Sequence, residues 1–518
     1  MADKKVHQGS EAELGPAEDT PGNGGAPRYG LFSKRIALLL MTNVLAAISG
    51  ILILSMVTKS LSTTDYGVWV QMVVTASLMH LVVGLGLPGA MVRFLAAEEN
   101  ETRLRESVYT VLAIVSVAGG VAALAFFVLA PHLGDWLFDG RTDIVRILAI
   151  VVFVECINSV LLHFLRARQM VKIYSSFLLM QTLLLAGFLA IAFLLGYGLV
   201  GATLAYLFSR AAVLLVLMVK TGSILGLGRP RLGSIKGYFD FGLPMVPVDV
   251  SDWVLSFSDR YLLALMVGVV YVGYYNPGYS LAALILMLVT PLRFLLPAAL
   301  SELFDKGRVE QVRSHLSYSL KYFLVLAIPA SVGMGLLSRP LLLLLTTEEI
   351  AREGYLVTPV VALAMVLFGC QIILNQVLII KKMTRTIGAV MTTSALLNIG
   401  ANLVLIPRFD VMGAAFSTLV AFAFALIATT HFSMAQLPFH VDLTAIGKTI
   451  VGSVLMGAVL VLAIPYCDAW GHLGTLLAIL VGIGVYGASV LLLRTFSKGE
   501  VLFFRSLISG RDGKEGLS

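Results

Sequence analysis

A succession of apolar runs separated by short polar connections most constrains the fold of this 518-residue chain. A helix needs about 20 apolar residues to cross the hydrocarbon core of a bilayer, and each run is near that length. We therefore predict an all-α integral membrane protein with about fourteen transmembrane helices. The runs lie near 36–57, 68–90, 107–130, 144–164, 174–195, 199–219, 241–267, 274–300, 316–337, 357–380, 386–406, 411–432, 447–466 and 472–493.

Composition supports the same class. The chain is 58% hydrophobic and only 13% charged, with a mean hydropathy of +0.91. Because a soluble domain is about 25% charged, this composition excludes an ordinary cytosolic enzyme and a disordered chain. Cys156, Cys370 and Cys467 lie in or beside apolar runs without CxxC spacing, so neither a disulfide framework nor a metal site is predicted.

Lysine and arginine gather in every second connection, and the net charge of +7 reflects this clustering rather than affinity for nucleic acid. Cytoplasmic loops carry such an excess, which predicts a multi-pass protein of the inner (plasma) membrane with both termini cytoplasmic. The longest outer connection, near 338–356, is too short for a separate domain. The clustered cations are Arg93, Arg103, Arg105, Arg166, Arg168, Lys172, Lys220, Arg229, Arg231, Lys236, Lys306, Arg308, Arg313, Lys381, Lys382 and Arg385.

A weak internal repeat predicts two lobes. The segment 168–172, followed by a span containing Gly187, resembles the segment 381–385, followed by a span containing Gly400. Six helices in each lobe would give parallel repeats, an arrangement that places a substrate cavity between them. The predicted divisions are a disordered cytoplasmic tail (1–30), an N-lobe (31–219), a cytoplasmic linker (220–240), a C-lobe (241–432), two further helices (433–495) and a basic cytoplasmic tail (496–518).

The seventh run carries an unusual set of charges. Asp249, Asp252, Ser256 and Asp259 are spaced to share one helix face. A charge at the centre of a bilayer costs roughly 2.5–3.5 kcal/mol even on insertion scales, so the face must line an aqueous cavity or join a structural ion-pair network. Asp259 and Arg260 are adjacent and should point about 100° apart. We therefore expect that they do not pair, and that Arg260 reaches another helix or the cavity.

Other charged residues in the runs are weaker candidates. Arg93 ends the second run, Arg293 lies between two prolines of the eighth, and Glu155 lies in the fourth. His80 and His163 are more typical of structural histidines than of proton relays. The sequence offers no metal-ligand cluster, catalytic triad or nucleotide-binding domain, so we expect neither an enzyme nor a bound cofactor.

Several short segments together resemble the polysaccharide exporters, the Wzx-type O-antigen flippases of the multidrug/oligosaccharidyl-lipid/polysaccharide (MOP) exporter superfamily. They are Leu31-Phe-Ser-Lys-Arg-Ile36, Leu61-Ser-Thr-Thr-Asp-Tyr-Gly-Val-Trp69, Gly84-Leu-Gly-Leu-Pro-Gly89 with Arg93, and Asp259-Arg260 with Val272-Gly-Tyr-Tyr275. The resemblance runs from about residue 31 to 495. It implies a MOP/MATE-like fold that moves polyprenyl-pyrophosphate-linked oligosaccharide from the cytoplasmic to the outer leaflet for surface polysaccharide synthesis.

The cargo implied by this resemblance is anionic, and Arg93, Arg260 and Arg293 could bind it, because the planar arginine fork binds phosphate oxygens in pairs. The carboxylates Asp249, Asp252 and Asp259 depart from a cationic lumen. They favour either coupling to H⁺ or Na⁺, with Glu155 as a further candidate, or a multidrug extrusion antiporter of the same superfamily.

Two functions from other classes of protein fit the sequence less well. A membrane oligosaccharide polymerase or ligase would need a sizeable outer loop, and a structural scaffold would not need the charged face. We expect a monomer in the lipid bilayer, with a glycan polymerase and other assembly proteins as candidate partners and no nucleic acid.

Overall fold

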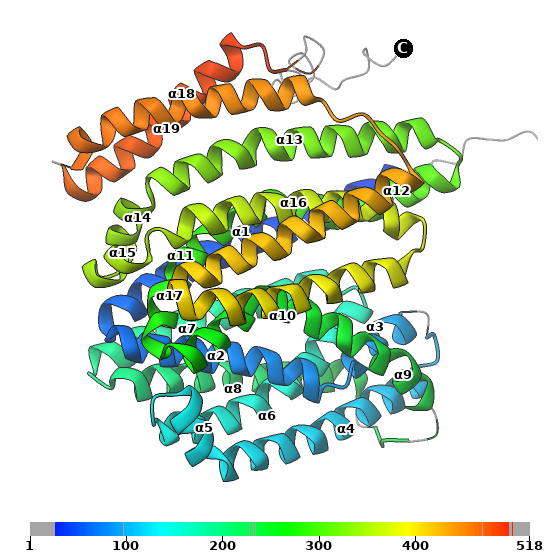
Figure 1. Ribbon diagram of the computed structural model, residues 1–518. Helices are drawn as coiled ribbons and strands as arrows, with labels where there is room; N and C mark the ends of the chain where they lie inside the picture. Colours follow the sequence, from blue (N-terminus) through cyan, green and yellow to red (C-terminus); the bar gives the residue numbers. More distant parts are fainter. Residues whose placement is uncertain are drawn as a thin grey trace, which may run out of the picture.

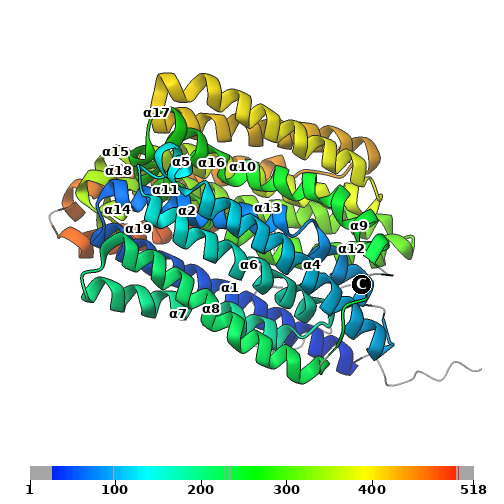
Figure 2. The ribbon, with the colours of Figure 1, turned by 90° about the horizontal axis from the view of Figure 1, so that it is seen from below.

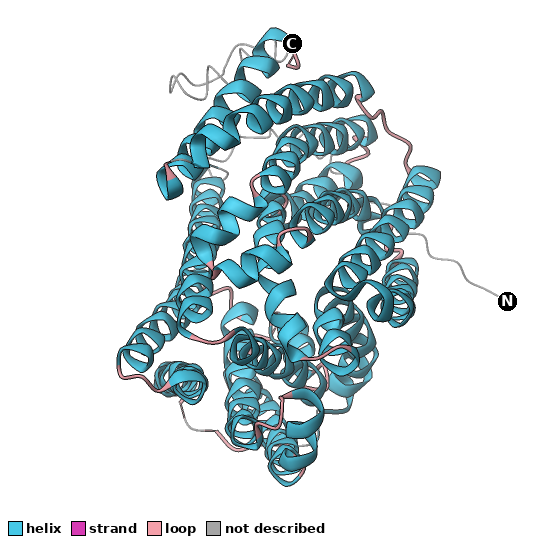
Figure 3. Cartoon of the chain, turned by 60° about the vertical axis from the view of Figure 1, so that its left-hand side comes forward, coloured by secondary structure: helices cyan, strands magenta, loops and turns pink. Residues whose placement is uncertain are grey.

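The computed structural model describes residues 26–96, 98–226, 228–231, 233, 235–468, 470–496 and 500. Within that part of the chain the fold is helical and contains no strand, as Figure 3 shows. The all-α prediction is therefore confirmed. Of the predicted tails, residues 1–25 and nearly all of 496–518 lie outside the described residues, whereas 26–30 belong to the first helix.

The first part of the chain, which we call the N-half, forms eight helices. They are α1 (Ala26–Ser60), α2 (Thr63–Val83), α3 (Leu87–Leu95), α4 (Glu101–Val128), α5 (Ala130–Leu137), α6 (Thr142–Ala167), α7 (Val171–Leu194) and α8 (Gly198–Leu225). Helix α1 packs on α7, α7 on α8, and α6 on both α4 and α8. Figure 2 shows α1, α7 and α8 together on one side of the molecule.

The second part, the C-half, runs to residue 436. It comprises α9 (Ile235–Gly242), η2 (Leu243–Met245), α10 (Val246–Met266), α11 (Val269–Ala283), η3 (Leu284–Leu288), α12 (Thr290–Asp305), α13 (Val309–Leu336), α14 (Ser338–Leu345), α15 (Glu348–Gly354), α16 (Val357–Ile380) and α17 (Thr384–Gln436). Helix α17 packs on α10 and α16, and α16 packs on α11 and α13. Helices α18 (Leu443–Asp468) and α19 (Gly471–Leu492) pack on each other, and α18 packs on α13 (Figure 1).

Every predicted apolar run falls on helical segments, and the runs 68–90, 241–267 and 274–300 are each divided between more than one of them. The runs 386–406 and 411–432 form two helices within α17, which meet at a kink where the backbone of Asp410 is not helical (φ 48°, ψ −124°). The run 274–300 is divided into α11, η3 and α12, and it bends by 55°. Pro291, at the start of α12, fits the bend because it lacks a backbone donor and crowds the preceding turn, whereas Pro277 and Pro297 lie inside α11 and α12.

Ten described helices are long and apolar enough to cross a bilayer, or eleven if the bent pair counts as one span. Helix α17 contains two of the predicted runs, and the charges of α10 lower its hydropathy. The chain is thus a multi-pass membrane protein, and the count of about fourteen spans stays a prediction.

The two ends of the helical bundle differ in charge. One end carries α3, α9 and α12 (right in Figure 1), and the clustered cations of the connections, such as Arg93 and Arg308, lie there. We call it the basic end. The other end, the far end, carries α14 and α15. The assignment of the basic end to the cytoplasm stays a prediction.

A charged residue outside the spans fixes the start of α18. The Oδ1 atom of Asp442 accepts a hydrogen bond from the backbone N–H of Ala445 at 2.9 Å, the geometry of a helix N-cap. Its Oδ2 atom lies 3.2 Å from Nζ of Lys321 on α13. The backbone hydrogen bond, and then Lys321, lower the pKa of Asp442 below its usual range.

We expect Asp442→Ala to lower the free energy of unfolding by about 1 kcal/mol at pH 7, because an N-cap is lost. The lowered pKa stabilises the fold at pH values above the unfolded-state pKa of about 3.9. This contribution disappears as the pH falls through the lowered folded-state value. Thermal unfolding of both proteins in detergent between pH 3 and pH 7 should therefore show a difference that shrinks below about pH 4; a difference that grows on acidification would contradict the assignment.

Candidate functional site

The acidic face of α10 divides into an exposed part and a buried part. Asp249 and Asp252 are exposed, and Ser256 is partly exposed and donates its hydroxyl to the carbonyl oxygen of Asp252 at 2.9 Å. Asp259, at the other end of the face, is only 2% exposed. The last part of the face thus joins a buried ion-pair network, whereas an aqueous cavity beside Asp249 and Asp252 stays a prediction.

The prediction that Asp259 and Arg260 do not pair is wrong. Nη1 of Arg260 lies 2.7 Å from Oδ1 of Asp259, and both side chains are 2% exposed. The angle between adjacent residues describes where their Cβ atoms point, whereas the long arginine side chain folds back along the helix. The same Nη1 donates to the carbonyl oxygen of Ser256 at 2.7 Å, which holds the side chain in this conformation.

From Arg260 the network crosses to α11 and α2, so the expectation that it reaches another helix is confirmed. Its Nη2 donates to Oδ1 of Asn276 at 3.3 Å, and Nδ2 of Asn276 donates to the hydroxyl of Tyr66 at 2.8 Å. Tyr66 belongs to the N-half and Arg260 to the C-half. Three hydrogen-bonding residues therefore join the halves inside the bundle.

Two tyrosines of α11 complete the environment of the ion pair. The hydroxyl of Tyr275 donates to Oδ2 of Asp259, and Cζ of Arg260 lies 3.9 Å from the ring centre of Tyr279. A buried ion pair needs such additional partners, because desolvation otherwise exceeds the Coulomb attraction. The sequence did not identify Tyr66, Asn276, Tyr275 and Tyr279 as members of this network, although the last three are polar groups inside the apolar run 274–300.

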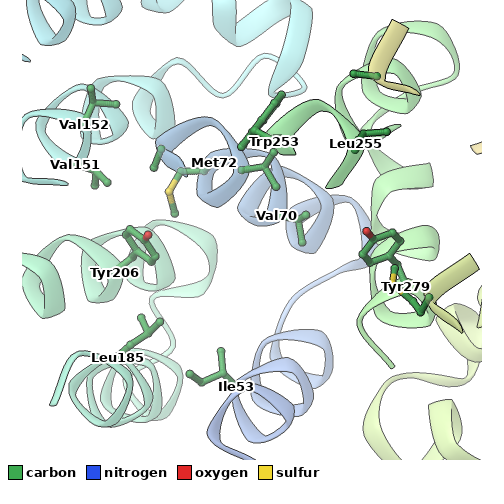
Figure 4. Packing of buried hydrophobic residues seen from close by; sticks show 14 of the residues in the cluster. Ile53, Val70, Met72, Val151, Val152, Leu185, Tyr206, Trp253, Leu255 and Tyr279 are labelled. Carbon is green, nitrogen blue, oxygen red and sulfur yellow. The ribbon is translucent and has the colours of Figure 1, made fainter. Parts of the chain in front are cut away.

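Further contacts tie α10 to α2. The hydroxyl of Tyr261 donates to Oγ1 of Thr75 at 2.6 Å, and Nε1 of Trp253 donates to Oγ of Ser77 at 2.9 Å. Figure 4 shows Trp253 beside Met72 and Val70 of α2, so apolar packing accompanies these bonds. The interface between the halves is therefore partly polar and partly apolar.

Glycines bring the halves together near both ends of the interface. At one end a Cβ on Gly67 would overlap the carbonyl oxygen of Val269, and a Cβ on Gly273 would overlap that of Thr63. At the basic end Gly86, whose φ of 66° favours glycine, lies against the carbonyl of Gly242. Helices approach this closely only where side chains are absent.

The three predicted arginines do not converge. Arg260 is enclosed in the network, whereas Arg93 is exposed at the basic end, with its Cζ 4.4 Å from the ring centre of Phe241 on α9. Arg293 is exposed on α12, and Asp252 is exposed on α10. The two helices thus each present an exposed charge, and the two charges are of opposite sign.

Glu155 belongs to a different site. Its Oε1 lies 2.8 Å from Nε of Arg210 on α8, and each side chain is 15% exposed. The hydroxyl of Tyr206 donates to the same oxygen at 3.0 Å. The carboxylate is therefore paired within the N-half. Among the described residues, no group of three or more His, Cys, Asp or Glu side chains could hold a metal ion.

A mainly apolar pocket of about 260 Å³ lies beside the network, between α1, α2 and α11. Tyr66 and Asn276, which belong to the network, also line it, together with Trp69 and aliphatic residues of α1 such as Ile51 and Leu54. The pocket offers a mainly hydrocarbon surface, in which Asn276 contacts Arg260 of the buried ion pair and Tyr66 contacts Asn276.

Solved structures with a similar fold define the class of protein. The lipid II flippase MurJ, in an inward closed conformation, matches with a TM-score of 0.70 at 16% identity, covering 90% of this chain and 99% of that one. An inward-facing multidrug resistance MATE transporter of the MOP superfamily matches with a TM-score of 0.65 at 14% identity, covering 79% and 96%. The chain has the fold of the MOP superfamily, as its sequence predicts.

Comparison of the sequence with protein families identifies the family to which the chain belongs. The family described as "Polysaccharide biosynthesis protein" matches residues 32–302, more than half of the chain, and the MatE family matches residues 244–404. The chain belongs to the polysaccharide biosynthesis protein family, which confirms the resemblance seen in its motifs.

Two archaeal proteins of Haloferax volcanii are relatives of this chain. The "Probable flippase AglR" is 28% identical over 237 residues, which are 45% of this chain and 49% of that protein. The "Probable low-salt glycan biosynthesis flippase Agl15" is 20% identical over 234 residues, again 45% and 49%. The matched region thus spans about half the length of these curated relatives.

Proposed function

We propose that this chain translocates a polyprenyl-pyrophosphate-linked oligosaccharide from the cytoplasmic to the outer leaflet of the inner membrane, for the synthesis of surface polysaccharide such as O-antigen, capsule or exopolysaccharide. It does so by alternating access, without catalysing a covalent reaction. The basic end and both termini are cytoplasmic. The transporter acts as a monomer that receives its cargo near a glycan polymerase and other assembly proteins.

The observation that carries the proposal is the interface between the halves. Helix α2 of the N-half meets α10 and α11 through glycine contacts and through hydrogen bonds from Asn276 to Tyr66 and from Tyr261 to Thr75. When the helices separate, these hydrogen bonds can be replaced by hydrogen bonds to water or cargo. A fully apolar interface would instead expose apolar surface to water, which is unfavourable. The interface is therefore suited to opening and closing.

The surroundings of the interface fit an amphipathic cargo. The apolar pocket beside α1 can take part of a hydrocarbon chain, and Arg293 and Asp252 present exposed charges on helices of the C-half. An anionic group can bind the exposed guanidinium, and H⁺ or Na⁺ can bind the exposed carboxylates. These charges support coupling of transport to H⁺ or Na⁺ at Asp249 and Asp252.

Extrusion of cationic drugs is a second candidate function. The exposed carboxylates of Asp249 and Asp252 favour it, because they would attract a cation to the surface of α10. The MatE match over residues 244–404 includes both aspartates. The family match over residues 32–302 and the flippase relatives support the lipid-linked oligosaccharide more strongly.

Deletion of the gene in its host separates the two candidates. For a flippase we expect lipid-linked oligosaccharide to accumulate on the cytoplasmic face and surface polysaccharide to be lost, both restored by the wild-type gene. Thin-layer chromatography of extracted lipids, with and without enzymatic labelling of intact spheroplasts, measures amount and sidedness. Unchanged glycans combined with greater sensitivity to cationic drugs would overturn the flippase proposal in favour of extrusion.

A further inference from the structure

A polar pocket lies within the N-half, apart from the interface with the C-half. It has a volume of about 140 Å³ and lies between α2, α6 and α7. We call it the α6 pocket, because most of its polar lining comes from one face of that helix. The polar lining consists of His80 on α2, Tyr174 on α7, and Glu155, Ser159, His163 and Arg166 on α6.

The residues of α6 are spaced so that they lie along one side of the helix. Positions 155, 159, 163 and 166 follow each other by four, four and three residues, which keeps side chains on one face. At 1.5 Å per residue the stretch rises about 16 Å. Arg166 is exposed at the basic end, and Glu155 is 15% exposed at the inner limit of the stretch. The polar face thus leads inward from the basic end.

The negative charge of the α6 pocket is already balanced. Glu155 forms its ion pair with Arg210, and the hydroxyl of Tyr206 donates to it. Arg210 also packs over the ring of Tyr206, with its Cζ 4.5 Å from the ring centre. A carboxylate with these partners repels an incoming anion weakly. The remaining formal charge at the pocket is the positive charge of Arg166.

The hydrogen bonds of His163 determine which of its ring nitrogens can face a ligand. Nδ1 lies 2.7 Å from the carbonyl oxygen of Ser159, which only accepts, so Nδ1 carries a hydrogen. Nε2 of the neutral ring is then an acceptor, and Nη1 of Arg166 lies 3.5 Å from it. Among the described residues, Arg166 has no carboxylate within ion-pair distance. Its guanidinium is therefore held toward the pocket by a weak contact that a stronger acceptor could replace.

We propose that the α6 pocket binds a phosphate oxyanion, with Arg166 as the principal contact and the hydroxyls of Ser159 and Tyr174 as further donors. His163 and His80 complete the wall. A guanidinium forms strong, charge-assisted hydrogen bonds with phosphate oxygens. The oxyanion is either the pyrophosphate of the lipid-linked cargo or a free phosphate compound. The first case rests on the proposed function.

The test uses the full chain, purified in lipid nanodiscs. Isothermal titration calorimetry measures binding of sodium pyrophosphate and, separately, of farnesyl pyrophosphate, a soluble short-chain polyprenyl pyrophosphate. We expect Arg166→Gln to weaken binding about tenfold or more, the loss expected when a charged hydrogen bond is removed. Tyr174→Phe, which removes one of the proposed hydroxyl donors, is a second variant in case Arg166→Gln fails to fold. Arg168→Gln is the matched control, because Arg168 is an exposed arginine two residues away that does not line the pocket.

A loss of binding in the pocket variants, but not in Arg168→Gln, supports the site. The two probes identify the source of the oxyanion. Preference for farnesyl pyrophosphate assigns the site to the lipid-linked cargo, and equal affinity assigns it to a free anion. Equal losses in Arg166→Gln and Arg168→Gln would mean general attraction to the basic end and would overturn the site, as would no binding of either probe. If wild-type protein binds a probe but translocates no lipid-linked oligosaccharide, the proposed function fails and the oxyanion site stands. If it translocates lipid-linked oligosaccharide but binds neither probe, the proposed function stands and the site fails.

Discussion

The substitution Gly273→Val should reduce translocation of lipid-linked oligosaccharide at least tenfold. A Cβ at this position would overlap the carbonyl oxygen of Thr63, so the larger side chain must push α11 away from α2. Overpacking of this kind costs roughly 1–3 kcal/mol. Because the overlap is with backbone, we expect the upper part of this range, about 2–3 kcal/mol, which lowers the population of the joined conformation by a factor of about 30–150. A transporter that needs this conformation in every cycle slows accordingly.

The control for this substitution is Gly187→Val on α7. Gly187 is also within a helix, but an added Cβ there meets no atom within 4 Å. Both purified variants should be reconstituted into proteoliposomes with equal amounts of incorporated protein, and their translocation rates should be compared with that of wild type. Equal rates for Gly273→Val and wild type would show that the contact between α2 and α11 does not form during transport.

Asp259→Ala should lower the free energy of unfolding by about 3–5 kcal/mol, the usual cost of removing one partner of a buried ion pair. The variant leaves the Arg260 guanidinium, which is 2% exposed, without its carboxylate. It also removes the acceptor for the hydroxyl of Tyr275. Asp252→Ala is the matched control on the same helix, since Asp252 is exposed, and should change stability by less than about 1 kcal/mol.

Chemical or thermal unfolding in detergent, followed by the fluorescence of Trp253 and the other tryptophans, measures both effects. The double variant Asp259→Asn/Arg260→Met should recover part of the lost stability, because no uncompensated charge remains. An Asp259→Ala protein as stable as the Asp252→Ala protein would mean that the ion pair contributes little. Asp259 would then be better assigned to coupling than to structure.

The helical membrane fold could be predicted because its signal is local. Each span needs enough apolar residues in sequence to cross the bilayer, and every predicted run lies on helical segments. The charges of α10 were equally visible, because a carboxylate such as Asp252 is conspicuous inside an apolar run. The break between the runs 386–406 and 411–432 was also visible, and the structure has a kink at Asp410 between them.

The partners of those charges could not be predicted, because they depend on how helices meet. Asn276 and Tyr66 are far apart in sequence, and only the close approach at Gly67 and Gly273 brings α2 and α11 into register. The pairing of Asp259 with Arg260 was missed for a different reason, since helical angles ignore the reach of a long side chain. Arg93, Arg260 and Arg293 were expected to share a cargo, and the fold separates them.

The polar face of α6 that contains His163 is visible in the sequence as a set of evenly spaced polar residues. His80 and His163 were assigned to structural roles as single residues, but Glu155, Ser159, His163 and Arg166 share one face of α6. A stripe of polar side chains on a transmembrane helix predicts a cavity or a polar partner more strongly than any one member does. The pairing of Glu155 with Arg210 on α8 then decides the charge of that cavity.

Reconstitution into proteoliposomes tests the central claim most directly. Purified protein is incorporated together with a fluorescent polyprenyl-pyrophosphate-linked oligosaccharide, and a membrane-impermeant quencher reports how much of it reaches the outer leaflet. We predict quenching beyond the initial outer-leaflet fraction in vesicles that contain wild-type protein, none beyond it in protein-free vesicles, and a rate at least tenfold lower than wild type in vesicles with Gly273→Val. Quenching that stays at the protein-free level with folded wild-type protein, with and without an imposed H⁺ or Na⁺ gradient, would contradict the assignment of this chain as a flippase.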